Sequence, residues 1–446
     1  MSKPKELWEM SAAELASLMS AGRTSAVRVV ESCLQRIRET EDTVQAWTFL
    51  DVEYARRQAK AADDRRLSGR PVGGLNGVPV GLKDIIDTAD MPTENGSVLH
   101  AGRMPSRDAG VVERLRAAGA VIMGKTVTTE FATRTPGKTR NPHNPAHTPG
   151  GSSSGSAAAV AAGMVPLSLG SQTGGSTIRP GAYCGIFALK PTHGLVSRHG
   201  MFRLSGSLDH VGLFARTTED VALLLEEVAG YDERDPDSIA RARAPYRALA
   251  AEEPPVEPRF GFFRSALWSR VDADAQTALV ELVERLGGRV EELELSVDAD
   301  ELAERHRTVM DAEMAINLRH EWETGRDRLS AALQSRISHG HEVRAPAYLA
   351  AKAATAALRE TCAELFEQRF DAILTPAAHG TAPLGLESTG EPTFNSMWTQ
   401  LGLPAITVPL LHGSNGLPLG VQLVGARDGD ARLLRTARWL ARSVGR

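Results

Sequence analysis

The sequence has 446 residues, of which 42% are hydrophobic and 24% charged, as in ordinary globular proteins. Its formal net charge of −4 gives no basic field that would attract nucleic acid, so we expect no nucleic-acid partner. The most apolar stretch, residues 157–169, is interrupted by Gly163 and Pro166. It is too short to cross a bilayer, so we expect no membrane contact.

The cysteines and histidines show no pattern of a metal site. The three cysteines, Cys33, Cys184 and Cys362, form no CxxC pair. Their odd number also gives no support to a disulfide scaffold. His339 and His341 fall in a predicted polar turn, at a spacing that is not typical of zinc ligands. The chain also lacks a dinucleotide-binding glycine motif and a Walker lysine. We therefore expect no metal, no cofactor and a reducing, cytoplasmic location.

The N-terminal third is predicted to begin with helices. Ser11 and Glu14 form a capping box for a helix that closes at Gly22, and Thr24 or Ser25 caps a second helix. The apolar face of that second helix is expected to contain Val27, Val30, Leu34 and Ile37. The pattern then predicts a strand at 46–51, a helix at 52–66, a strand at 78–82, a helix at 111–118 and a strand at 121–123.

A long loop rich in Gly, Pro, Asn and Ser spans 135–155, and we interpret it as a site loop. The elements expected after it are a helix at 156–162, a strand at 165–169, a Gly/Ser-rich turn at 170–176, an apolar segment at 187–189, a helix at 218–229, a polar segment at 231–258, a mostly helical region at 270–370, strands at 371–375, 405–409 and 420–424, and a helix at 431–443. The alternation of strands and helices predicts an α/β sheet covered by helices on both faces.

Lys83 follows the short apolar strand at 78–82. Burial there would disfavour the ammonium and lower the lysine pKa, and a neutral lysine can act as a general base. A surface lysine paired with Asp84 or Asp87 is the alternative interpretation, and this segment alone favours it.

Two Gly/Ser-rich segments contain candidate catalytic serines. Residues 150–156 have glycines that permit unusual backbone conformations and hydroxyls that can cap the next helix. Ser176 follows two glycines in a turn after a strand, where backbone N–H groups can form an oxyanion hole. Ser153 matches GxSxG by letter, but a loop precedes it instead of a strand. His193 and His210 are less favoured bases, because nothing else completes a Ser–His–Asp triad.

Together these segments resemble the amidase signature family. Residues 150–163 are similar to the start of the signature, residues 170–176 to its nucleophile turn, and Lys83 lies in a GVP-x-x-x-KD context. Ser152 and Ser176 are 24 residues apart, as in the family. Further similarity covers most of the chain and is weakest at 231–371, with matching segments at 189–194, 207–212 and 402–425.

The resemblance implies an amidohydrolase acting on a small-molecule amide. Ser176 would be the nucleophile, Ser152, preceded by a cis peptide, the proton relay, and Lys83 the general base. The oxyanion would be held by the backbone N–H groups of Thr173, Gly174, Gly175 and Ser176. The family fold implies one large α/β/α domain with a mixed sheet over residues 1–446. Within it we expect an N-terminal helical segment (1–66), a catalytic core (67–230), a variable helical pocket region (231–370) and a C-terminal part completing the core (371–446).

The sequence departs from the commonest family pattern around the nucleophile. The family often has Asp four residues before the nucleophile and Arg two residues after it, where this chain has Gln172 and Ile178. An arginine stands one position later, at Arg179, where it either binds a substrate carboxylate or plays a structural role. The residues expected to bind substrate are Gln172, Arg179, Ser153, Asn395 and Trp398.

Two other functions remain open from the sequence alone. One is the amidase component of a tRNA-dependent glutamine amidotransferase, which would need protein partners. The displaced arginine and the lack of a basic surface argue against it, so we expect a freestanding enzyme, either a monomer or a homodimer. The other is a catalytically inactive binding protein of the same fold, which the complete set of triad residues disfavours.

Overall fold

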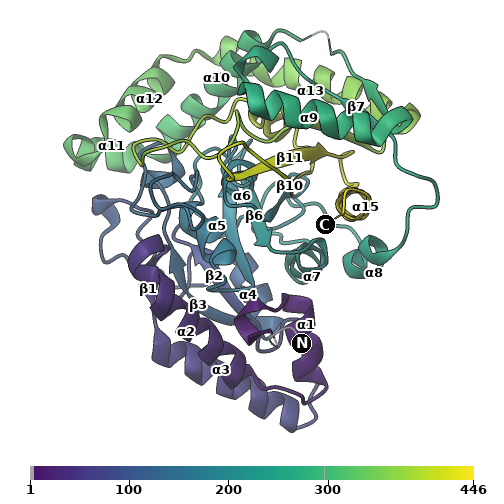
Figure 1. Ribbon diagram of the computed structural model, residues 1–446. Coiled ribbons are helices and arrows are strands. Elements are labelled where there is room, and N and C mark those ends of the chain that lie inside the picture. The colour runs from purple at the N-terminus through teal and green to yellow at the C-terminus, as the bar shows by residue number, and fades with distance from the viewer. Residues whose placement is uncertain (1–4, 296, 446) are drawn as a thin grey trace.

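The computed structural model describes residues 5–295 and 297–445 (Figure 1). Within these residues, one sheet has the strand order β1-β3-β2-β4-β6-β5-β10-β11-β9-β7-β8. Its strands are β1 (Trp47–Leu50), β2 (Pro79–Lys83), β3 (Val121–Thr126), β4 (Leu167–Gln172), β5 (Phe187–Lys190), β6 (His210–Ala215), β7 (Phe260–Phe262), β8 (Val290–Glu292), β9 (Ala372–Pro376), β10 (Ala405–His412) and β11 (Pro418–Val424).

The helices cover both faces of the sheet (Figure 1). They are α1 (Ala12–Ser20), α2 (Ala26–Val44), α3 (Val52–Leu67), α4 (Gly110–Ala117), α5 (Ser154–Ala161), α6 (Ile178–Tyr183), α7 (Thr218–Val228), α8 (Tyr246–Ala251), α9 (Ala273–Leu286), α10 (Ala299–Asn317), α11 (Arg319–Gly325), α12 (Ala331–Glu342), α13 (Ala345–Gln368), α14 (Ser396–Gln400) and α15 (Asp430–Ser443). β2 pairs in parallel with β3 and β4, whereas β4 pairs antiparallel with β6. This confirms the predicted mixed α/β sheet.

The core lies where the central strands are buried on both faces. Every residue of β2, β3 and β4 is buried, because helices cover the sheet on both sides. In Figure 1, α10–α13 form a group at one end of the molecule, and α1–α3 lie at the opposite end. No helix in the described part of the chain is both long enough and apolar enough to span a membrane.

The predicted N-terminal helices are confirmed by their caps. The Ser11 side chain accepts a hydrogen bond from the Glu14 N–H, and the Glu14 side chain completes the capping box. Ser25, one of the two proposed caps, accepts from the Arg28 N–H at the start of α2. Placing Val27 on the apolar face is wrong, because that side chain lies on the solvent side and is 37% exposed.

Three differences from the predicted elements lie near the nucleophile. α5 starts at Ser154, two residues earlier than predicted. β4 continues to Gln172 through part of the predicted turn, because its last residues pair with β6. A short helix, α6, then follows the turn and contains Arg179 and Pro180. Proline is tolerated there because the N–H groups of a first helical turn need no intrahelical acceptor.

The polar region before the C-terminal strands also differs from prediction. His339 and His341 lie on α12, not in a turn, because the 331–342 segment buries Leu333 and Ile337 on one helical face. No group of three or more His, Cys, Asp or Glu residues within the described ranges is arranged to hold a metal ion.

Candidate active site

Lys83 ends β2 with its side chain fully buried. Its Nζ lies 2.7 Å from Ser152 Oγ and 2.8 Å from Ser171 Oγ. Burial lowers the Lys83 pKa well below its ordinary value, against a smaller opposing effect of the Asp209 charge. This excludes the surface-lysine interpretation, and burial favours the neutral amine, which can accept a proton.

Ser152 stands where the long site loop enters α5. The Gly151–Ser152 peptide bond is cis, as the family resemblance implied. The Ser152 side chain is 1% exposed, so its hydroxyl is screened from solvent beside the Lys83 amine. The next residue is also held in place, because Ser153 Oγ donates to Ser171 O and accepts from the Ser171 N–H, each at 3.1 Å.

In the turn between β4 and α6, residues 173–176, the first three carbonyl groups accept hydrogen bonds from residues outside the turn. His306 Nε2 donates to Thr173 O at 2.9 Å, Thr399 Oγ1 to Gly174 O at 2.6 Å and the Arg179 N–H to Gly175 O at 3.0 Å. In a trans peptide the carbonyl of one residue and the N–H of the next residue point in opposite directions. The N–H groups that follow these three carbonyls therefore point away from the residues that donate to the carbonyls. Those of Gly174, Gly175 and Ser176 donate no hydrogen bond to any described residue. They are free to stabilise a developing oxyanion.

A cavity of about 830 Å³ opens over this turn. Its lining includes all four residues of the turn, together with residues of α10, α12 and the loop 389–394. The Ser176 hydroxyl has no hydrogen-bond partner in the described part of the chain and is available to a bound substrate. Lys83 and Ser152 do not line the cavity, so they can act on a substrate only through another group.

Arg179 connects the turn at 173–176 with the segment that contains Ser152. Its Nη2 donates to Gly151 O at 2.6 Å and its Nε to Thr389 O at 2.7 Å. The residue lines the cavity, yet Nη1 is buried without a partner. Burial lowers the Arg179 pKa to about 10, so the guanidinium is charged at neutral pH.

Of the other residues expected to bind substrate, one lines the cavity and three do not. Trp398 lines the cavity, and its ring meets the Phe263 ring edge-on at 5.8 Å. Ser153, Gln172 and Asn395 are fully buried and do not line the cavity. Gln172 accepts the N–H groups of Thr177 and Ile178 at the start of α6, and Asn395 donates to Ala377 O, so each side chain holds backbone near the turn.

His193 and His210 do not form a serine–histidine pair. Burial first, and then nearby Arg198, lowers the pKa of His193 to about 4, while burial holds the pKa of His210 well below its ordinary value. His210 Nδ1 lies 2.7 Å from the Leu208 carbonyl, and neither ring contacts a catalytic serine.

Three residues that contact the site were not singled out from the sequence: Ser171, Asp209 and His306. Ser171 and Asp209 lie in segments that carry the family resemblance, but nothing in their spacing indicates contact with Lys83 or Thr173. His306 comes from the helical region where the resemblance is weakest, so only the packing of α10 against the turn reveals it.

Solved structures, a peptide amidase among them, share this fold. The chain has a TM-score of 0.91 and 30% identity with a protein from a vestigial complex linked to the evolutionary origins of an s-triazine catabolic enzyme, over 98% of this chain and 99% of that one. It has a TM-score of 0.85 and 30% identity with the peptide amidase of Stenotrophomonas maltophilia, over 97% and 96% of the two chains.

Curated relatives correct one expectation. The chain is 36% identical to a glutamyl-tRNA(Gln) amidotransferase subunit of Anaeromyxobacter dehalogenans, over 100% of this chain and 98% of that protein. It is 34% identical to the equivalent subunit of Lachnospira eligens, over 94% and 95%. These relatives contradict the expectation of no nucleic-acid link and no protein partner beyond a second copy. The net charge of −4 addresses only direct binding of RNA phosphates by this chain, whereas in a complex another subunit can hold the RNA.

The family model described as Amidase matches residues 28–434, which include the complete site. One of the solved neighbours named above is a peptide amidase of the same fold. The chain therefore belongs to the amidase family, whose signature its motifs resemble.

Proposed function

We propose that the chain cleaves the C–N bond of a carboxylic amide through an acyl-enzyme on Ser176. The observation that supports this most is the pairing of Lys83 with Ser152 next to a turn with free N–H groups. Neutral Lys83 accepts the Ser152 hydroxyl proton, and Ser152 accepts the Ser176 proton. Ser176 Oγ then bonds to the carbonyl carbon, and the oxyanion is stabilised by the turn.

The second half of the reaction reverses the proton path. The relay returns the proton to the departing nitrogen as the C–N bond breaks, leaving an ester on Ser176. Water then loses a proton to the same relay, attacks the ester carbonyl, and releases the acid and the free serine. The expected products are a carboxylic acid and either ammonia or an amine.

The curated relatives favour a setting in which this amidase works as one component of an amidotransferase. Both relatives described above are amidotransferase subunits by name and match the chain nearly end to end. In that setting glutamine is the amide, and a partner uses the released ammonia. A freestanding amidase is the second candidate, favoured by the similar identity to the peptide amidase. The three buried free thiols suit a reducing compartment, and a cytoplasmic location stays a prediction.

The first test is labelling with a serine-directed fluorophosphonate and turnover of an amide panel that includes glutamine. Ser176→Ala should lose labelling and turnover while keeping its melting temperature. Ser153→Ala, in the neighbouring buried serine, is the matched control and should keep the label. A Ser176→Ala variant that still turns over amide would refute the nucleophile assignment.

The second test separates the two settings. The chain is expressed with and without the other genes of its own operon or locus, and glutamine hydrolysis and co-purifying proteins are measured. A stable complex with higher glutaminase activity supports the amidotransferase setting. Full activity on other amides by the isolated chain, with no gain from partners, supports the freestanding amidase.

A further inference from the structure

Thr173, the first residue of the catalytic turn, meets a buried carboxylate from the neighbouring strand. The antiparallel pairing of β4 with β6 sets Gln172 opposite His210. The residue after β4 therefore lies beside the residue before β6. These residues are Thr173 and Asp209, and the Thr173 hydroxyl donates to Asp209 Oδ1 at 2.6 Å.

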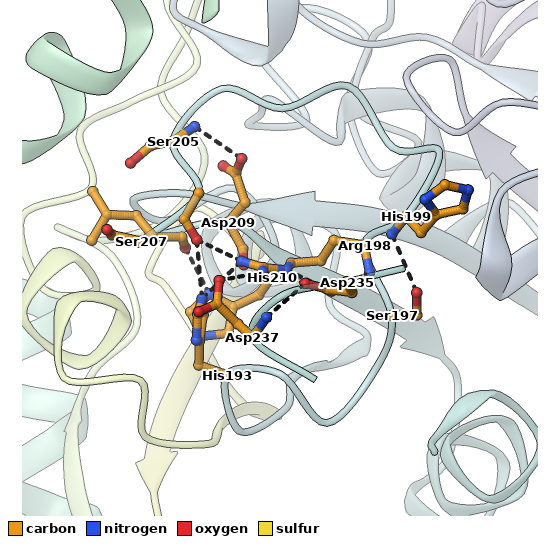
Figure 2. Close-up of polar contacts among 12 residues, drawn as sticks. His193, Ser197, Arg198, His199, Ser205, Ser207, Asp209, His210, Asp235 and Asp237 are labelled. Carbon is orange, nitrogen blue, oxygen red and sulfur yellow. Dashed lines mark hydrogen bonds and ion pairs between the residues drawn. The ribbon is translucent and has the colours of Figure 1, made fainter. Parts of the chain in front are cut away.

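Asp209 is itself firmly held (Figure 2). Its side chain is 3% exposed, and Oδ2 accepts the N–H groups of Leu204 and Ser205, both at 2.9 Å. Arg198 Nη1 donates to the backbone oxygen of Asp209 at 3.3 Å. The carboxylate thus has its position fixed by backbone on one side and presents its other oxygen to Thr173.

The carbonyl of Thr173 is held by a second residue, His306 on α10, whose Nε2 lies 2.9 Å from it. Burial lowers the His306 pKa to about 4, so at neutral pH it is a neutral donor and brings no charge to the turn. The side chain and the carbonyl of Thr173 are therefore both anchored, and this fixes the direction of the Gly174 N–H that follows.

The charge of Asp209 also bears on Lys83, where it favours the protonated amine. Burial raises the Asp209 pKa to about 6, against the opposing effects of the Thr173 hydroxyl, the Ser205 N–H and the Arg198 charge, so the carboxylate is mainly ionised above that pH. The charged group that acts on Asp209 is Arg198, which is itself paired with Asp235 and Asp237. The Asp209 charge in turn opposes the effect of burial on the Lys83 pKa.

We propose that Asp209 is a positioning residue of this amidase, which fixes the catalytic turn through Thr173 and acts on Lys83 through its charge. This inference rests on the function proposed above. A purely structural Asp209 would only close the loop 203–209, and its loss would change stability without changing how catalysis depends on pH.

The experiment compares Thr173→Val, Thr173→Ser and Asp209→Asn for kcat, KM and the pH dependence of kcat/KM. Valine keeps the shape of threonine but loses the hydroxyl, so kcat should fall about tenfold or more with KM little changed, since oxyanion contacts strengthen in the transition state. Serine keeps the hydroxyl and should retain most of kcat. Neither Thr173 substitution removes the Asp209 charge, so the acid limb of the kcat/KM profile should stay at the wild-type pH.

Asp209→Asn removes the charge that favours protonated Lys83, so its acid limb should move to lower pH. A Thr173→Val enzyme with wild-type kcat, or an Asp209→Asn enzyme whose acid limb stays at the wild-type pH, overturns the proposal. If Asp209→Asn does not fold, the comparison of kcat between Thr173→Val and Thr173→Ser decides the outcome. Fluorophosphonate labelling of Ser176 is measured in every sample. Absence of labelling in the wild type would count against the proposed function itself.

Discussion

Lys83 Nζ and Ser171 Oγ lie 2.8 Å apart, on the side chains of two adjacent parallel strands. A neutral amine has one lone pair, which must face Ser152 if Lys83 is to accept its proton. An N–H of the amine can then donate to Ser171, and this contact orients the lone pair. In the proposed mechanism, Ser171 therefore helps to prepare Lys83 as the base.

Ser171→Ala should lower kcat about tenfold, as expected for one lost hydrogen bond of roughly 1–1.5 kcal/mol. Ser152→Ala should cost several orders of magnitude, because it breaks the relay itself. Ser168→Ala is the matched control, since Ser168 is a fully buried serine of β4 that donates to Gly81 O and does not contact Lys83. Equal kcat for the Ser168 and Ser171 variants would contradict the orienting role.

The pH profile should show an ascending acid limb. Lys83 must be neutral to accept a proton, and burial lowers its pKa well below the ordinary lysine value. Activity should therefore rise as pH increases through the folded pKa of Lys83 and stay high into the alkaline range. The measurement is kcat/KM between pH 5 and pH 10 on a neutral amide. A steady fall between about pH 6 and pH 9 would be incompatible with a lysine base.

The sequence predicted the elements that carry the catalytic residues better than their surroundings. The apolar strand before Lys83 and the capped helices have local signals, and both are found in the structure. The extension of β4 to Gln172 depends on pairing with β6, 38 residues away from Gln172 in the chain, and no local pattern encodes it. His306 was missed for the same reason, because its role depends on how α10 packs over the turn.

Lys83 should also lower the stability of the fold. A lysine whose folded pKa is depressed binds fewer protons when folded than when unfolded, so stability rises with pH between the two pKa values. At neutral pH this buried amine therefore costs free energy. Lys83→Met should abolish activity and raise the free energy of unfolding by about 1 kcal/mol, with a larger gain at lower pH.

Thermal or urea unfolding at several pH values tests this stability effect. Lys60→Met is the control, because the Lys60 side chain is 71% exposed and its pair with Asp64 lies on the surface of α3. That substitution should change stability by less than about 0.5 kcal/mol at every pH. A Lys83→Met protein that is less stable than the wild type, or equally stable at all pH values, would show that burial of the amine is fully compensated.

Arg179 is expected to select for substrates that carry a carboxylate. Its Nε and Nη2 are already bound to the Thr389 and Gly151 carbonyls, so a two-nitrogen grip on a carboxylate is not available. Nη1 remains without a partner, beside the Gly175 backbone. Arg179→Ala should then lose kcat/KM on a carboxylate-bearing amide by roughly 1.5–3 kcal/mol more than on a matched neutral amide, as for one hydrogen bond to a charged group.

The structural role of Arg179 is tested in the same variant. Removing the guanidinium leaves two buried carbonyls without donors, so the melting temperature should fall whatever the substrate. Arg134→Ala is the matched control, because Arg134 also lines the cavity but is paired with Glu391 and half exposed. It should lose little on either amide. Equal losses by Arg179→Ala on the charged and neutral amides would assign the side chain to holding the Gly151 and Thr389 segments together, with no part in substrate selection.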